Sequence, residues 1–264
     1  MICNMAKDQT VLFHSTVFGP IHSRRLGTSL GINLLPDDGK VCTFDCVYCE
    51  AGYNSQGTGT TGLPAVERLR HDLEARLSEM KEGGETLDVI TFSGNGEPTL
   101  HPDFPEIVDI VNELRDKYFP AARTSVLTNS TRIFDPKVAD ALRRVDNNIL
   151  KLDSAIEPTM RLIDNPVQKE FTVERLVEAL AQFAGEGIIQ TMFLRGEHNG
   201  RRIDNTTPEE IDALIEAYLK IRPKEVMIYS LDRSTPEEHL EKVERPELEE
   251  IAARIREAGI TVAL

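Results

Sequence analysis

Three of the four cysteines in this 264-residue chain lie close together. Cys42, Cys46 and Cys49 fall within the eight-residue segment CTFDCVYC, and the fourth is Cys3. In a reducing compartment, closely spaced cysteines are more often metal ligands or redox groups than partners in structural disulfides. Three sulfurs on so short a segment can converge on one metal centre.

The cysteine spacing alone leaves three kinds of centre open. A zinc site normally has four ligands, so it would need Cys3 or a histidine from elsewhere in the chain. A redox pair could use Cys46 and Cys49, but it would leave Cys42 unexplained. An iron–sulfur cluster usually takes four thiolates, so three would leave one iron open to another ligand.

A second motif, Gly94-Asn95-Gly96-Glu97-Pro98, follows an apolar run over residues 87–93. Its glycines would allow a ligand to approach the backbone closely, and its carboxylate is a suitable acceptor for an ammonium group. The alternative is that the glycines only form a tight turn between a strand and a helix.

The order of these two motifs resembles the radical S-adenosylmethionine (SAM) superfamily. Cys42, Cys46 and Cys49 match its Cys-x-x-x-Cys-x-aromatic-Cys signature, with Tyr48 at the aromatic position, and Asn95 is a departure from its Gly-Gly-Glu-Pro element. Gly19-Pro20 and the segment SRRLGTSLG at 23–31 resemble the iron–sulfur oxidoreductases that are related to the wyosine-forming tRNA enzymes. This resemblance extends over about 19–231.

The resemblance implies an oxidoreductase with one 4Fe-4S cluster on the three cysteines and SAM at the open iron. A reduced cluster would cleave SAM to methionine and a 5′-deoxyadenosyl radical, which removes hydrogen from a substrate such as a tRNA base or a small anionic metabolite. The electron would come from a flavodoxin or ferredoxin. Two alternatives remain: a radical-generating activase of a partner protein, and a non-enzymatic metal-binding protein that uses Cys3 as a fourth ligand.

The resemblance also implies a set of cofactor-binding residues near the ends of strands. Gly94 to Glu97 would bind the methionine amino group, polar residues after two later strands would reach the ribose or the carboxylate, and an arginine would pair with the carboxylate. Helix capping, a structural ion pair and core packing are the competing roles of these residue types. The full set is Tyr48, Gly94, Asn95, Gly96, Glu97, Thr128, Asn129, Asp153, Ser154, Arg195 and Tyr229.

Basic residues provide candidates for substrate binding. His22, Arg24 and Arg25 precede the first expected strand, and Lys151 lies on the fourth, in phase with Asp153. Adjacent arginines on an acidic protein favour an anionic substrate, although pairing with surface acids would explain them equally well. A lysine inside a barrel could hold an anion or form a Schiff base.

Short apolar runs that alternate with amphipathic segments predict the elements that position these residues. Leu69, Leu73 and Leu77 recur at helical spacing, and Thr207-Pro208-Glu209-Glu210 and Thr235-Pro236-Glu237-Glu238 both look like helix starts. Strand–helix alternation predicts an α/β fold with a parallel sheet, and about six units fit an open, partial barrel, in which functional groups gather at the C-terminal ends of the strands. Strands are expected over residues 31–35, 87–93, 123–127, 149–153, 189–194, 225–231 and 260–264.

We expect a single domain over 1–264, with an N-terminal extension over 1–18, a cysteine loop over 42–49 and a flexible Gly/Thr loop over 52–62. The formal charge of −14 opposes a large phosphate-binding surface, which disfavours tRNA unless a local basic patch exists. No apolar run approaches the ~20 residues that span a bilayer, and the N-terminus lacks a signal-peptide pattern. The expected compartment is the cytosol.

Overall fold

A computed structural model describes residues 11–23, 27–233 and 235–264. Cys3, Arg24 and Arg25 lie outside these ranges. Among the described residues, no helix is long and apolar enough to cross a bilayer.

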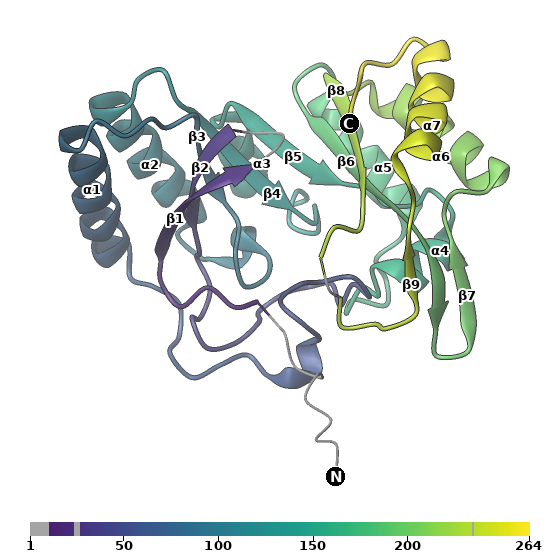
Figure 1. The fold of residues 1–264 in the computed structure, drawn as a ribbon, viewed down its shortest axis with the longest axis horizontal. Coiled ribbons are helices and arrows are strands. Elements are labelled where there is room, and N and C mark those ends of the chain that lie inside the picture. The colour runs from purple at the N-terminus through teal and green to yellow at the C-terminus, as the bar shows by residue number, and fades with distance from the viewer. Residues whose placement is uncertain (1–10, 24–26, 234) are drawn as a thin grey trace.

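A single open sheet forms the centre of the described chain (Figure 1). Its strands follow the order β1-β2-β3-β4-β5-β6-β8-β10, and neighbours from β2 to β10 run parallel, whereas β1 is antiparallel to β2. The two ends of this order do not pair, so the predicted open, largely parallel arrangement is confirmed. These strands are β1 (Val17–Ser23), β2 (Gly27–Ile32), β3 (Val89–Phe92), β4 (Arg123–Thr128), β5 (Asn147–Lys151), β6 (Ile188–His198), β8 (Glu225–Ser230) and β10 (Val262–Ala263).

The central strands are buried on both faces, as parallel strands covered by helices must be. All four residues of β3 are buried, and so are four of the five residues of β5. On α1 (Val66–Glu82), Leu69, Leu73 and Leu77 are fully buried, which confirms the predicted apolar stripe. Burying each of these side chains contributes roughly 1.5–3 kcal/mol.

Helices connect the parallel strands and cover the sheet (Figure 1). Figure 1 shows α1 and α2 together beside the first half of the sheet, with α5, α6 and α7 beside the second half. The α-helices are α1 (Val66–Glu82), α2 (Phe104–Tyr118), α3 (Pro136–Arg143), α4 (Glu157–Ile163), α5 (Val173–Leu180), α6 (Pro208–Ile221) and α7 (Arg245–Glu257), and the 3-10 helices are η1 (Asn54–Gln56), η2 (Pro98–Leu100) and η3 (Ala181–Phe183).

The structure corrects the prediction at the start of the sheet. The first parallel strand is β2 over Gly27–Ile32, whereas it was expected over 31–35. Strand β1 precedes it and forms a hairpin with it, so the last residues of the expected N-terminal extension, Val17 and Phe18, belong to the sheet.

A second correction concerns the segment after β8. No helix begins at Thr235; instead Thr235 Oγ1 donates to the carbonyl of Glu237 (2.7 Å), and the short strand β9 (Leu240–Lys242) pairs with β6. Helix α7 begins later, at Arg245. Pairing with a distant strand therefore outweighs a purely local helix-start signal here. The strand β7 (Arg201–Asp204), which also pairs with β6, was not predicted because its exposed arginines hide any apolar alternation.

Candidate functional site

The cysteine loop, residues 42–49, lies between β2 and α1 and is fixed by backbone hydrogen bonds on two sides. At its start, the Val41 N–H donates to the carbonyl of Asn95 (3.0 Å), and the Glu97 N–H donates to the carbonyl of Val41 (3.0 Å). Further along, the Val47 N–H donates to the carbonyl of Ile163 (3.0 Å) at the end of α4. The loop is therefore tied both to the turn after β3 and to the segment after β5.

The three cysteines of this loop are free thiols in protected positions. Cys46 is buried, and Cys42 and Cys49 are half-buried. Burial raises the pKa of Cys42 to about 11 and, despite the nearby Lys151 ammonium, raises the pKa of Cys46 well above its ordinary value. The Cys42 and Cys46 thiols therefore stay protonated until a metal replaces the proton, because a metal ligand must be a thiolate.

Among the residues that the structure describes, no three His, Cys, Asp or Glu side chains lie close enough to hold one metal ion. A single-ion zinc site is therefore not preformed in the described part of the chain. An iron–sulfur cluster makes a different demand, because each cysteine binds a separate iron atom and the sulfurs are spread around the cluster. Three thiols on one anchored loop suit that donor set.

The turn after β3 requires glycine at two positions. Gly94 and Gly96 have φ angles of +146° and +133°, which side chains rarely adopt. A Cβ atom on Gly96 would lie 1.9 Å from the carbonyl oxygen of Val41, and one on Gly94 would lie 2.4 Å from Oδ1 of Asn33. The turn thus brings its backbone directly against Val41, the residue that precedes the cysteine loop.

Glu97 is buried, and donors already surround its carboxylate. Oε1 accepts hydrogen bonds from the Thr99 N–H (3.1 Å), the Thr99 hydroxyl (2.5 Å) and the Thr128 hydroxyl (2.7 Å), while Oε2 accepts one from the Asn129 N–H (2.6 Å). Burial raises the pKa of this carboxyl, and the hydrogen bonds oppose that rise. The side chain therefore links the ends of β3 and β4, and any contact with a methionine ammonium would be additional to this role.

Asn95 is fully buried, and its side chain forms hydrogen bonds to other parts of the chain instead of facing a ligand. Its Oδ1 accepts from the Phe13 N–H (2.9 Å), and its Nδ2 donates to the carbonyls of Phe13 (3.0 Å) and Pro36 (2.8 Å). The asparagine that distinguishes this motif from Gly-Gly-Glu-Pro therefore fastens the segment before β1 to the site. The Asn95 backbone is also engaged: its carbonyl accepts from the Val41 N–H, and its own N–H donates to Oδ1 of Asn33 (3.1 Å).

Asn129 connects the end of β4 to the cysteine loop. Its Nδ2 donates to Oγ1 of Thr43 (2.8 Å) and lies 3.5 Å from Sγ of Cys42, and its Oδ1 accepts from the N–H of Thr131 (3.0 Å). The buried Thr128 binds Glu97 rather than facing open space. Asn129 is thus placed to donate a hydrogen bond to a cysteine sulfur, which stabilises its thiolate form.

A buried charged network lies on the other side of the loop, at the end of β5. Nζ of Lys151 donates to Oδ2 of Asp153 (2.9 Å), is within 3.5 Å of Oδ1 of Asp164 and within 3.8 Å of Sγ of Cys46, and also contacts the hydroxyl of Tyr48. Burial alone would lower the pKa of Lys151, but these negative neighbours raise it well above its ordinary value. The side chain is therefore in its ammonium form, and the nearby carboxylates balance its charge. A protonated lysine is a poor nucleophile for Schiff-base formation.

Tyr48 and Asp153, both predicted site residues, are brought together by this network. The Tyr48 hydroxyl donates to Asp153, whose other oxygen accepts from the Met192 N–H (2.9 Å). Asp164, which the sequence patterns did not single out, completes the group; burial and the adjacent Asp153 raise its pKa well above the ordinary value. Only the fold could identify Asp164, because it lies more than 100 residues from Cys46, with which it shares a hydrogen bond.

Ser154 and Arg195 have structural partners. The Ser154 hydroxyl donates to Oε2 of Glu210 (2.7 Å) and caps the Ile156 N–H (2.9 Å). Arg195 forms a two-point ion pair with Glu247 at the start of α7, which raises the pKa of the guanidinium. Binding a methionine carboxylate would require this pair to open.

His22 is exposed on β1, and the described residues give it no place among the groups around the cysteine loop. Tyr229, the last member of the predicted set, lies near the end of β8 and lines a cavity there.

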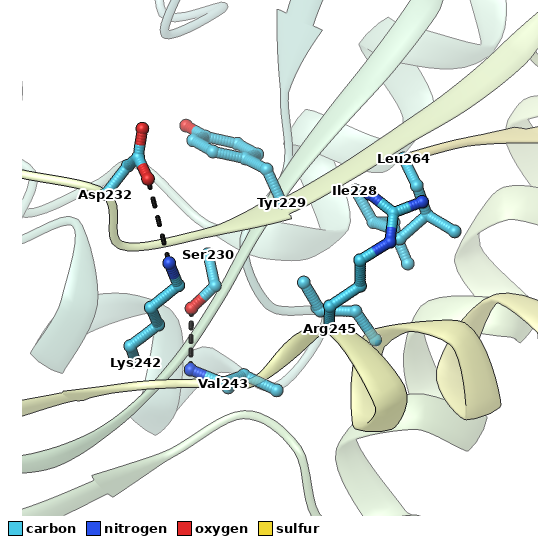
Figure 2. A pocket seen from close by; sticks show the side chains of 9 residues that line it. Ile228, Tyr229, Ser230, Asp232, Lys242, Val243, Arg245 and Leu264 are labelled. Atoms are coloured by element: carbon cyan, nitrogen blue, oxygen red, sulfur yellow. Dashed lines mark hydrogen bonds and ion pairs between the residues drawn. The ribbon is translucent and has the colours of Figure 1, made fainter. Parts of the chain in front are cut away.

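A cavity of about 240 Å³ lies at the end of β8, between that strand, Lys242 and the first turn of α7 (Figure 2). Figure 2 shows the Asp232–Lys242 ion pair on one side and Arg245 near Leu264 on the other; Tyr229 stands on its wall. Both polar and apolar side chains line the cavity.

Lys40, which no sequence motif singled out, is only 2% exposed. Its Nζ donates to the carbonyl of Gly52 (2.7 Å) and to Oδ1 of Asp45 (3.3 Å) within and just after the cysteine loop. Its position two residues before Cys42 was the available signal, but sequence alone does not tell a buried lysine from a solvated one. The Gly/Thr loop is held at its far end by Asp38, whose carboxylate accepts hydrogen bonds from Thr60 and Thr61.

The open parallel sheet, the cysteine loop and the glycine turn define the class of protein. The Radical SAM superfamily model matches residues 38–199, which include both motifs, and the chain belongs to that superfamily.

A UPF0026 protein of Synechocystis sp. is 31% identical over 226 residues, covering 83% of this chain and 77% of the relative. A protein of Brachyspira hyodysenteriae with the name "GTPase Obg" is 29% identical over the whole chain, but the chain spans only 37% of its length. A UPF0026 protein of Helicobacter pylori strain J99 is 27% identical, covering 87% of this chain and 69% of the relative.

Solved structures share the fold at low sequence identity. A radical SAM methyltransferase from Sphaerobacter thermophilus superposes with a TM-score of 0.64 at 14% identity, covering 89% of this chain and 65% of that one. TYW1 with a bound lysine-pyruvate adduct gives a TM-score of 0.60 at 17% identity, covering 88% and 75% of the two chains. At these identities the likeness establishes the fold.

Proposed function

We propose that this protein is a radical SAM enzyme that holds one 4Fe-4S cluster on Cys42, Cys46 and Cys49 and binds SAM beside it. The observation that carries this proposal is that the anchored cysteine loop and the Gly94–Gly96 turn are joined by backbone hydrogen bonds at the C-terminal edge of the sheet. When bound, the cluster supplies one electron that cleaves SAM to methionine and a 5′-deoxyadenosyl radical, which takes hydrogen from the substrate.

The residues of this chain would hold the cluster and SAM and shield them from water. Gly94 and Gly96 are only half-buried, so part of the turn's backbone remains accessible to a ligand. Asn129 provides a hydrogen-bond donor near the Cys42 sulfur, and the burial of Cys46 keeps water away from its bond to iron. Exclusion of water protects reactive intermediates from side reactions.

The proposed reaction class is that of an oxidoreductase with a one-electron donor of the flavodoxin or ferredoxin type. A reducing compartment such as the cytosol suits it, because free thiols persist there. Its substrate class includes small anionic metabolites and tRNA bases; the net charge of −14 favours the former, because it repels an extended phosphate backbone.

The test is anaerobic reconstitution with iron and sulfide, followed by dithionite, SAM and chromatography of 5′-deoxyadenosine. We expect product from the wild type, loss of product in Cys42→Ala, Cys46→Ala and Cys49→Ala, and retention in the matched control Cys3→Ala. A fully loaded cluster that forms no product and shows no spectral change with SAM would refute the proposal. Loss of the metal centre in Cys3→Ala would favour a closed four-ligand site.

A further inference from the structure

Lys40 places a buried positive charge beneath the cysteine loop. The side chain is 2% exposed, and its ammonium is held by the Gly52 carbonyl (2.7 Å) and by Asp45 Oδ1 (3.3 Å). Its own N–H donates to the Gly57 carbonyl (3.1 Å), which fixes the backbone at the same point. The ammonium therefore has little freedom to leave.

Both groups that hold this ammonium belong to the segment that carries the cysteines. Asp45 lies between Cys42 and Cys46 in the sequence, and the Gly52 N–H donates to the carbonyl of Cys49 (2.9 Å). The ammonium is therefore fixed against the segment that bears the three sulfurs.

The second buried lysine near the loop is different. Lys151 faces both Asp153 and Asp164, so its charge is balanced by carboxylates within its own network. Within the described ranges, the ion pair of Lys40 is with the single carboxylate of Asp45, whose side chain is 20% exposed and therefore partly screened by water. Of the two lysines, Lys40 has the less fully compensated charge.

We propose that Lys40 is a positioning residue that stabilises the reduced form of the cluster by its charge and thereby raises the reduction potential. The inference rests on the proposed function, since it needs a cluster on the three cysteines. One-electron reduction adds one negative charge to a buried centre, and a fixed cation nearby lowers the energy of that state more than that of the oxidised state. The electron comes from the external donor, and no bond to Lys40 forms or breaks.

The test compares two substitutions that break the same ion pair, Lys40→Met and Asp45→Asn. In Lys40→Met the cation is lost, so we expect the equilibrium constant for one-electron reduction to fall at least tenfold, which is about 59 mV. In Asp45→Asn the opposing anion is lost, and we expect a smaller shift in the opposite direction. A purely structural role of the pair would move both variants in the same direction or neither.

The potentials are measured by electron paramagnetic resonance during anaerobic redox titration of each reconstituted full-length protein, with iron and sulfide content determined first. Lys40→Arg should retain the wild-type potential, and Lys220→Met, an exposed lysine on α6, is the matched control for removal of a charge. If Lys40→Met loads no cluster, the reduction potential of Asp45→Asn decides. A potential above that of the wild type supports the inference, and an unchanged or lower potential overturns it.

Other outcomes separate the two proposals. A loaded wild type with an unchanged potential in Lys40→Met overturns the inference and leaves the proposed function intact. A wild type that takes up no iron overturns the proposed function and the inference with it, and this is seen before any potential is measured.

Discussion

Replacing Glu97 tests whether this carboxylate holds the fold or serves only as a cofactor ligand. Glu97→Met keeps the volume but removes both acceptor oxygens. The buried N–H groups of Thr99 and Asn129 would then lose their acceptor, at about 1–3 kcal/mol each, or about 2–6 kcal/mol together. The penalty for burying a carboxyl, visible in the raised pKa of Glu97, is relieved at the same time. We therefore expect a net loss of about 3 kcal/mol in the free energy of unfolding.

The assay is urea unfolding of the cofactor-free protein, followed by circular dichroism. Glu97→Gln, which keeps one acceptor oxygen, should lose less than Glu97→Met, and Glu257→Gln, an exposed control near the end of α7, should stay within about 0.5 kcal/mol of the wild type. Wild-type stability of Glu97→Met without cofactor would refute the argument, because it would mean that the four hydrogen bonds contribute nothing to the fold.

Three further predictions follow from individual contacts. Gly96→Ala should destabilise the protein by about 2 kcal/mol or more, because its Cβ would lie 1.9 Å from a carbonyl oxygen at a φ of +133°; unchanged denaturant unfolding would contradict this. Glu247→Gln should lower stability by about 1 kcal/mol and leave the KM for SAM unchanged, since Arg195 serves the fold; a lower KM would instead show that Glu247 competes with the cofactor for Arg195. Burial alone would raise the pKa of Asp146, but hydrogen bonds from a backbone N–H and from Arg115 lower it below the ordinary 3.8. The Asp146 carboxylate therefore stabilises the folded state above pH 3.8, and this stabilisation disappears as the pH falls through the lowered pKa. The free energy of unfolding of Asp146→Asn should therefore be about 1 kcal/mol lower than that of the wild type at pH ~7, and the two values should become equal in acid. If the difference were the same at pH ~2, the carboxylate charge would be excluded as its cause.

The strands and the apolar faces of the helices were largely predictable, because both depend on local periodicity. The stripe on α1 and the buried runs of β3 and β5 appear where the sequence indicates them. The segment at Thr235 and the strand β9 were not predictable, since pairing with β6, about 45 residues away, decides that conformation. A local helix-start signal contributes about 1 kcal/mol and is easily outweighed by such a pairing.

The sequence by itself determined the chemistry available to this protein: three closely spaced thiols, a glycine turn after a buried strand, and the alternation that predicts a parallel sheet. These are properties of residue type and spacing along the chain. Tertiary structure decided how the polar side chains are used, because hydrogen-bond partners and burial depend on which distant segments meet. Glu97 became a link between two strands, Arg195 the partner of Glu247, and Lys40 a buried cation beneath the cysteines, since only the fold brings those groups within 4 Å of one another or removes them from water.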